Sequence, residues 1–148
     1  MQQKVYPFLM FASGAREAAE FYTSVFPDGK IIEAGGPSVS FEVGGQRFDA
    51  YDGGSYFSFC EGLSMHVVCE SQEEVDYYWE RLREGGGQES ACGWLKDRFG
   101  LSWQVVPTAY YRLIRDPDPQ RAKRAMDAVL KMAKLDTRAM EAAADGDG

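Results

Sequence analysis

The sequence predicts an α+β fold in which two tandem βαβββ modules form curved mixed sheets around a cleft, with C-terminal helices after them. A short apolar run is followed by an amphipathic helix twice, and three short β-rich segments follow each helix. The apolar positions of the two helices begin at Ala18 and Val75, which are 57 residues apart. Because one module covers only one face of its sheet, a second module is expected to cover the other face.

The first module is expected to span residues 1–58. Val5–Phe11 is a short apolar run that is typical of a buried strand. Ser13 is predicted to cap a helix that ends near Val25, before the turn residues Pro27-Asp28-Gly29. Three strands follow, the last two joined by a Gly44-Gly45 turn: Lys30–Ala34, Ser38–Val43 and Gln46–Tyr51.

The second module is expected to span residues 59–111. Leu63–Cys69 is again a short apolar strand, Ser71 begins a capping box, and Gly85-Gly86-Gly87 ends the helix. Strands are predicted at Gln88–Ser90, Ala91–Lys96 and Leu101–Val106. The last two belong to the stretch CGWLKDRFGLSWQVVP, in which a tight turn separates them and Gln104 stands in the middle of the second.

Residues 112–148 are predicted to be a helical extension. Asp116-Pro117-Asp118-Pro119 is a helix start signal, and a last short helix begins near Asp136. One apolar stripe runs along the first of these helices: Ala122, Ala125, Met126, Val129 and Ala133. The stripe packs either on its own domain or on a second copy of the chain, and the sequence leaves both possibilities open.

The composition restricts the classes of partner. A chain of 148 residues with 45% hydrophobic residues is expected to form one compact domain overall. Its net charge of −7 gives it no electrostatic reason to bind nucleic acid or an anionic membrane. Three cysteines, with no signal sequence and no apolar run long enough for a membrane span, predict a cytoplasmic protein.

Four stretches of the chain are similar to a known superfamily. They are PFLMF with REAAEFYTSVFPD, GGQRFDAYDGG, ESQEEVDYYWERL, and CGWLKDRFGLSWQVVP with DPDPQRAKRAM. On these residues the chain resembles the vicinal oxygen chelate superfamily, which includes glyoxalase I, extradiol dioxygenases, and bleomycin and fosfomycin resistance proteins. It looks most like the PhnB-like branch, often labelled 3-demethylubiquinone-9 3-methyltransferase. The loop Gly35-Gly36-Pro37 is shorter than usual for this branch, either because it is truly short or because residues are missing from the numbering.

The resemblance implies a divalent metal in the cleft, but the residues at the matched positions are poor ligands. The ligand positions of the superfamily fall on Pro7, Ser64 and Gln104, and the first-module counterpart of Gln104 lies near Ala50. Proline and alanine offer no side-chain donor, a serine hydroxyl is a weak ligand, and a glutamine carbonyl is neutral. We therefore expect no metal and no other cofactor. The methyltransferase label is also not supported, because the glycines after Glu84 follow a helix and lack a nucleotide-binding pattern.

The strand pattern places His66, the single histidine of the chain, with Ser64 on the face turned away from the helix. His66 is either hydrogen-bonded to neighbouring backbone or to Gln104, or a general base with a pKa near neutrality. Gln104 is either a buried amide bonded to the adjacent strand or a group that orients a substrate. His66 and Gln104 are the candidates for catalysis. The predicted substrate-binding set is Leu9, Phe11, Ser64, His66 and Gln104.

Other chemically notable side chains are expected to pack. Trp94, Trp103 and the run Tyr77-Tyr78-Trp79 have strand and helix spacings that favour the core over an aromatic cage. Cys92 has no adjacent base in the sequence, so it is expected to be a packing thiol.

The chain is therefore expected to be a metal-free protein that binds a small organic molecule in the cleft between its modules. The alternatives are a glyoxalase- or dioxygenase-type enzyme with a rebuilt active site, and an interaction module whose cleft is filled by its own side chains. The resemblance also implies a homodimer, and the apolar stripe of residues 122–133 is a candidate for part of its interface.

Overall fold

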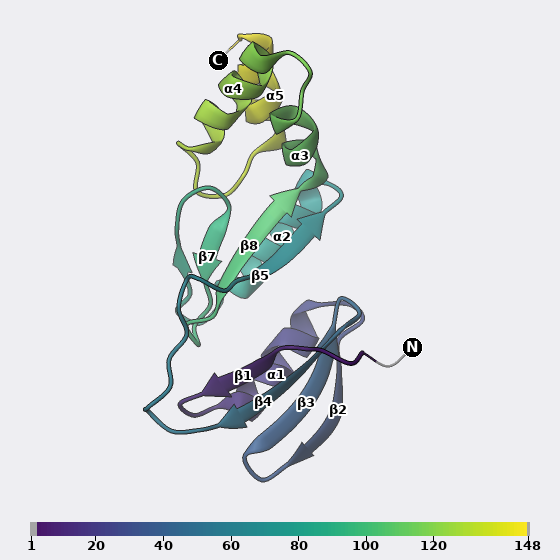
Figure 1. The fold of residues 1–148 in the computed structure, drawn as a ribbon, viewed down its shortest axis with the longest axis vertical. Helices are drawn as coiled ribbons and strands as arrows, with labels where there is room; N and C mark the ends of the chain where they lie inside the picture. The colour runs from purple at the N-terminus through teal and green to yellow at the C-terminus, as the bar shows by residue number, and fades with distance from the viewer. Residues whose placement is uncertain (1–2, 148) are drawn as a thin grey trace. The chain divides into compact units, whose positions relative to one another are not determined.

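The computed structural model describes residues 3–147, which form two compact units that divide between Phe59 and Cys60. Each unit contains a four-stranded mixed sheet and a helix that packs along it (Figure 1). The expected α+β fold with two βαβββ repeats is confirmed. Within residues 3–147, no helix combines the length and the apolar character needed to cross a bilayer.

The first unit has the element order β-α-β-β-β. Its elements are β1 (Phe8–Phe11), α1 (Ala15–Val25), β2 (Lys30–Gly35), β3 (Ser38–Val43) and β4 (Gln46–Asp52). The strand order is β1-β4-β3-β2, with β1 parallel to β4 and the other neighbours antiparallel. Gly35 pairs with Ser38, so Gly36 and Pro37 alone close the short loop as a two-residue hairpin.

The start of α1 differs from the sequence prediction. The N-cap is Gly14, which has a φ of 82° and no side chain to accept a hydrogen bond. The acceptor comes instead from Asp52, because its Oδ1 lies 2.8 Å from the backbone nitrogen of Ala15. The predicted cap at Ser13 is therefore wrong. A carboxylate 37 positions away in the sequence satisfies the first turn of the helix.

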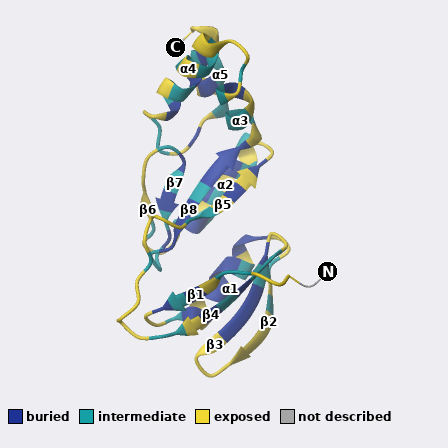
Figure 2. Ribbon diagram, viewed as in Figure 1, coloured by how far each residue is buried: buried dark blue, intermediate teal, exposed yellow. Residues whose placement is uncertain are grey.

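Aromatic side chains fill the space between α1 and the first sheet. The ring centroids of Tyr22 and Phe41 are 5.9 Å apart, and Phe41 stacks on Phe48 at 5.1 Å. Buried residues alternate with less buried ones along β1 and in the middle of β4, whereas β2 is mostly exposed (Figure 2). Since Phe41 pairs with Phe48, and Ala50 pairs with Leu9, this buried row identifies the face that packs under α1.

The second unit repeats this topology. Its first five elements are β5 (Met65–Cys69), α2 (Gln72–Leu82), β6 (Gln88–Glu89), β7 (Trp94–Lys96) and β8 (Ser102–Pro107). The strand order is β5-β8-β7-β6, with β5 parallel to β8. The capping box at Ser71 is confirmed, because its Oγ accepts a hydrogen bond from the Glu74 amide at 3.2 Å.

Asp97 organises the turn between β7 and β8. Its side chain is buried, with only 3% of the residue exposed. Oδ1 accepts hydrogen bonds from the amides of Phe99 at 2.9 Å and Leu101 at 3.1 Å. Oδ2 accepts one from the indole Nε1 of Trp103 at 2.9 Å. The predicted turn therefore folds around a buried carboxylate, and Gly100 provides the positive φ of 89° that the turn requires.

Three helices follow the second sheet: α3 (Thr108–Ile114), α4 (Pro119–Val129) and α5 (Thr137–Asp145). The start signals of α4 and α5 are confirmed, since the carboxylates of Asp118 and Asp136 accept hydrogen bonds at the first turns. α3 was not predicted. It has seven residues and begins after Pro107 without a side-chain cap, so the sequence carries no start signal for it.

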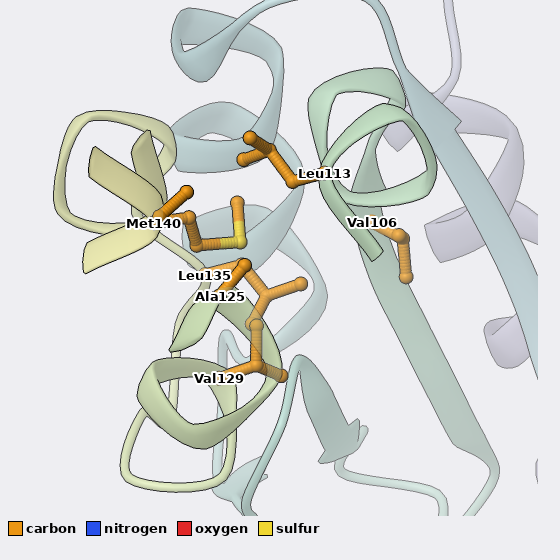
Figure 3. Packing of buried hydrophobic residues seen from close by; sticks show 7 residues of the cluster. Val106, Leu113, Ala125, Val129, Leu135 and Met140 are labelled. Atoms are coloured by element: carbon orange, nitrogen blue, oxygen red, sulfur yellow. The ribbon is translucent and has the colours of Figure 1, made fainter. Parts of the chain in front are cut away.

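The apolar stripe of α4 packs inside its own unit. Ala125 and Val129 are 0% and 1% exposed, in a cluster with Val106, Leu135 and Met140 (Figure 3). The sequence left open whether the stripe packs on its own domain or on a second copy of the chain. The structure shows that it packs on its own domain. Ala122, Met126 and Ala133 are only half-buried, so a part for this stripe in a dimer interface stays a prediction.

Candidate functional site

Several candidate residues share the face of the second sheet that is turned away from α2. His66 of β5 pairs with Gln104 of β8, and Gln104 pairs with Trp94 of β7, so their side chains form one row. The next residue on β5, Val67, is 8% exposed, whereas His66 is exposed. Because side chains alternate along a strand, His66 lies opposite the α2 side. We call this face, with Ser64, His66, Trp94 and Gln104, the open face.

Gln104 contacts Ser64 on the open face. Its Nε2 donates a hydrogen bond to the Ser64 hydroxyl at 2.9 Å. The two polar side chains at matched ligand positions therefore bind each other. The carbonyl oxygen of Gln104 can still accept a hydrogen bond, and the second N–H of the amide can still donate one.

His66 contacts α3 through a residue that the sequence analysis did not identify. Its Nε2 lies 2.6 Å from the hydroxyl of Tyr111, where a backbone group or Gln104 was expected. Burial of part of the ring lowers the pKa of His66 below its ordinary value, so the imidazole is neutral at about pH 7. When Nδ1 carries the proton, Nε2 accepts the hydrogen bond from Tyr111. The pair can bind a polar ligand group or move a proton.

A cavity of about 320 Å³ lies between the open face and the C-terminal helices, and all of its walls come from the second unit. The lining residues include His66, Trp94 and Gln104 from the sheet and Tyr110, Tyr111 and Arg115 from the region of α3. The sequence analysis missed the second group, because it did not predict α3. The pair Tyr110-Tyr111, which begins four positions after Val106, was the available signal.

The three tryptophans occupy different environments. Trp79 and Trp103 are each 3% exposed and belong to the core, as expected. Trp94 was also expected in the core, but it is half-buried and lines the cavity. Cys92 packs against the C-terminal cluster, and its amide donates a hydrogen bond to the Met132 carbonyl at 2.8 Å. Cys92 has a φ of 60°, which is uncommon for a residue with a side chain.

The first-unit residues that were expected in the cavity lie in the core instead. Leu9 and Phe11 are 2% and 3% exposed. They pair with Ala50 and Asp52, in the row that packs under α1. Their placement on the ligand-facing side is therefore corrected. Phe8, which is 57% exposed, occupies the opposite face.

The spacing between equivalent residues of the two units is one residue longer for the first strand than for the helix. This difference explains why Leu9 and Phe11 face the core. The helices repeat at 57 residues, but the equivalent buried strand residues Leu9 and Val67 are 58 residues apart. An offset of one residue moves every side chain of a strand to the other face. Phe8 pairs with Asp49 as His66 pairs with Gln104. The first-unit counterpart of Gln104 is therefore Asp49.

Asp49 is held in a polar network on the first sheet. Its Oδ1 accepts hydrogen bonds from the Ser40 hydroxyl at 2.7 Å and from the Arg47 guanidinium at 3.1 Å. Asp49 raises the pKa of Arg47, whose guanidinium lies 4.7 Å from the ring centroid of Tyr6. Pro7, at another matched position, contributes only its carbonyl, which accepts from the Asp49 amide at 3.1 Å.

These residues do not fit the divalent metal that the superfamily implies. Asp49 is already neutralised by Arg47, and Ser64 and Gln104 are bonded to each other. Among residues 3–147, no three His, Cys, Asp or Glu side chains form a group that can hold a metal ion. Transition-metal sites of this kind need about three imidazole, thiolate or carboxylate donors.

The paired βαβββ units define the glyoxalase-type fold of the vicinal oxygen chelate superfamily. A family model described as 3-demethylubiquinone-9 3-methyltransferase matches residues 3–106, and the chain belongs to this PhnB-like family. The match ends before α3, so the three C-terminal helices lie beyond it. No curated protein matches the chain.

Solved structures support the same assignment. The PhnB protein of Bacillus cereus is 32% identical with a TM-score of 0.65, and the match covers 72% of this chain and 100% of that chain. Protein PA1353 of Pseudomonas aeruginosa is 21% identical with a TM-score of 0.58, covering 72% and 98% of the two chains. The fosfomycin resistance protein FosX of Listeria monocytogenes, complexed with Mn(II) and sulfate, is 17% identical with a TM-score of 0.58, covering 78% and 98%. The last two likenesses show the fold alone.

Proposed function

We propose that the protein binds a small organic molecule on the open face of the second unit without a catalytic metal. The cavity of about 320 Å³ is the observation that carries this proposal. Its volume lies near the lower end of the range for small-molecule pockets. Its walls combine aromatic side chains with a few polar groups, which is the usual composition of such sites.

The donor set supports the metal-free part of the proposal. The open face offers one imidazole, His66, and two neutral oxygens, from Ser64 and Gln104. The methyltransferase in the family description is not carried over to this chain. Gly85 and Gly86 have φ values of 76° and 123° and follow the end of α2, so they terminate a helix.

Isothermal titration calorimetry with 2-naphthamide and 2-naphthoate tests the proposal. At least one of these aromatic probes is expected to bind at one site per chain, unchanged by prior dialysis against EDTA. Trp94→Ala should weaken binding by about tenfold, because it removes an aromatic wall. Tyr77→Ala is the matched control, since Tyr77 is 40% exposed and lies outside the cavity. Binding of neither probe, or a stoichiometric transition metal held by cavity side chains, would contradict the proposal.

The contact between His66 and Tyr111 favours a second candidate, an enzyme with a rebuilt, metal-free site. In the tautomer whose Nε2 donates to the Tyr111 hydroxyl at 2.6 Å, Nδ1 of the neutral imidazole can take a proton from a substrate while Tyr111 orients the ring. In that case turnover of a substrate found by screening should collapse in His66→Ala while binding persists. Unchanged turnover in this variant would remove His66 from the mechanism.

A homodimer and a cytoplasmic location complete the proposal. Both rest on the family resemblance and on the cysteines, since Cys60, Cys69 and Cys92 are all free thiols. Burial raises the pKa of Cys69 to about 12, so this thiol stays protonated and unreactive. Sedimentation at micromolar concentration tests the assembly, and a monomer would contradict it.

A further inference from the structure

We propose that the cavity of the second unit selects a planar aromatic molecule with one negative charge, such as an aromatic carboxylate, and that Arg115 binds this charge. The inference rests on the proposed function and names its ligand class. Tyr110, Tyr111 and Arg115 lie outside residues 3–106, the part that the family model matches. The selectivity for charge would therefore belong to the C-terminal extension, while Trp94 of the shared fold contributes to the selectivity for an aromatic ring.

The aromatic part of the inference follows from the cavity walls. Trp94 contributes an indole from the sheet, and Tyr110 and Tyr111 contribute two phenols from α3. The two tyrosine rings have centroids 5.2 Å apart and an interplanar angle of 80°. Rings set at such an angle offer both a face and an edge to a flat ligand. Met126 of α4, also in the lining, can adapt to the outline of the ligand.

The charge part of the inference follows from the lining residues. The chain has 23 acidic residues against 16 Lys and Arg, yet no Asp or Glu is among the described residues that line the cavity. His66 is neutral at about pH 7, because partial burial lowers its pKa. Among the lining residues that the structure describes, Arg115 is therefore the one that carries a full charge at this pH.

The guanidinium of Arg115 is available to a ligand. The neighbouring carboxylate of Asp116 is engaged by Arg121 at 3.1 Å, and Asp145 binds the same arginine at 2.6 Å. Within residues 3–147, Arg115 pairs with no carboxylate, and its guanidinium lies 5.1 Å from the ring centroid of Tyr111. An exposed guanidinium beside an acid-free cavity is suited to a bidentate contact with a ligand carboxylate.

Neutral donors in the cavity can orient the rest of the ligand. Gln104 retains one amide N–H and its carbonyl oxygen, and the Tyr111–His66 pair can accept or donate. Neither group prefers a cation. A cavity of about 320 Å³ is suited to a molecule of about one or two fused rings.

The two naphthalene probes separate charge from shape. In calorimetry at about pH 7, 2-naphthoate should bind about tenfold more tightly than 2-naphthamide, because the amide lacks the charge. Arg115→Gln should reduce the affinity for naphthoate to that for the amide and leave amide binding unchanged. The matched control is Arg112→Gln, because Arg112 lies on α3 close to Arg115 in sequence, pairs with Glu141 at 2.9 Å and does not line the cavity. This control should change neither affinity.

The possible results separate this inference from the proposed function. Equal binding of both probes by the unaltered protein would overturn the inference and leave the proposed function intact. Binding of neither probe would overturn both. Tighter binding of naphthoate that survives Arg115→Gln would show that another group holds the charge, and this would also overturn the inference.

Discussion

Both units place their first strand beside and parallel to their last strand, yet their equivalent faces carry different chemistry. On the first sheet, Asp49 and Arg47 neutralise each other. On the second sheet, the counterpart of Asp49 is the neutral Gln104, and helices of the same unit cover part of this face and leave a cavity. The repeat therefore specifies the backbone, while the side chains of one face and the C-terminal extension decide where a ligand can bind.

The two units also stabilise their last hairpins differently. In the first unit, the carboxylate of Asp28 accepts hydrogen bonds from the amides of Gly44 at 2.9 Å and Gly45 at 3.0 Å, in an exposed position. In the second unit, Asp97 makes its contacts from inside the turn and is buried. The same type of side chain should therefore contribute differently to stability in the two units.

The largest expected effect is that of Asp97→Ala. This variant leaves the indole N–H of Trp103 and two backbone amides without their acceptor, so it should lower the free energy of unfolding by about 4 kcal/mol. Asp28→Ala should lower it by about 1 kcal/mol, because water can replace the carboxylate. Urea denaturation followed by circular dichroism measures both losses. Equal losses of unfolding free energy in the two variants would show that the buried and the exposed aspartate stabilise their hairpins to the same extent.

The next effect tests whether the C-terminal helices belong to the second unit. Met140 is 0% exposed in the cluster with Val106 of β8, so Met140→Ala should lower the free energy of unfolding by about 3 kcal/mol. Leu130→Ala is the control, since Leu130 is 58% exposed and should contribute less than about 0.5 kcal/mol. A loss for Met140→Ala as small as that of the control would show that α5 is only loosely attached.

A smaller effect is expected from pH, and it should originate in the second unit, which holds the single histidine. Burial lowers the pKa of His66 in the folded state, so the unfolded chain takes up the proton first as the pH falls. His66 therefore reduces stability as the pH falls through about 6.5, and has no such effect at higher pH. His66→Gln should remove this dependence. An NMR titration of the imidazole that gives a pKa above 6.5 would contradict the sign.

The smallest effect is expected for Arg47→Gln in the first unit. The network of Arg47, Asp49 and Ser40 is partly open to solvent, so the loss of stability should be slight and should shrink as NaCl is added. Thermal unfolding at low and high salt measures it. A large loss that does not depend on salt would mean that this network organises the first sheet as strongly as Asp97 organises the second hairpin.

The sequence predicted the order of elements in both βαβββ units, because apolar periodicity and capping residues are local signals. It did not predict that Gly14 caps α1 or that Asp52 accepts the hydrogen bond of the first turn, since Asp52 is 37 positions from its donor, Ala15. It also missed α3, which is short and has no side-chain cap. Contacts distant in sequence and weakly marked helix starts account for these errors.

The candidate site was predictable only in part. Strand alternation correctly separated His66 from the buried residues of β5, and the row of His66, Gln104 and Trp94 follows from the register. Leu9 and Phe11 were assigned to the wrong face of the first sheet. The reason is that the spacing between equivalent residues of the two units is one residue longer for the first strand than for the helix. Tyr111 and Arg115 were missed because their positions in the cavity depend on α3.

The most direct measurement is a ¹H–¹⁵N spectrum of the three tryptophan indoles during titration with 2-naphthoate. Trp94 lines the cavity, whereas Trp79 of α2 and Trp103 of β8 are each buried in the core of the same unit. The indole signal of Trp94 should shift and saturate with the calorimetric affinity, while the other two remain nearly fixed. A ligand that binds with that affinity and leaves the Trp94 signal unmoved would contradict a binding site on the open face of the second unit.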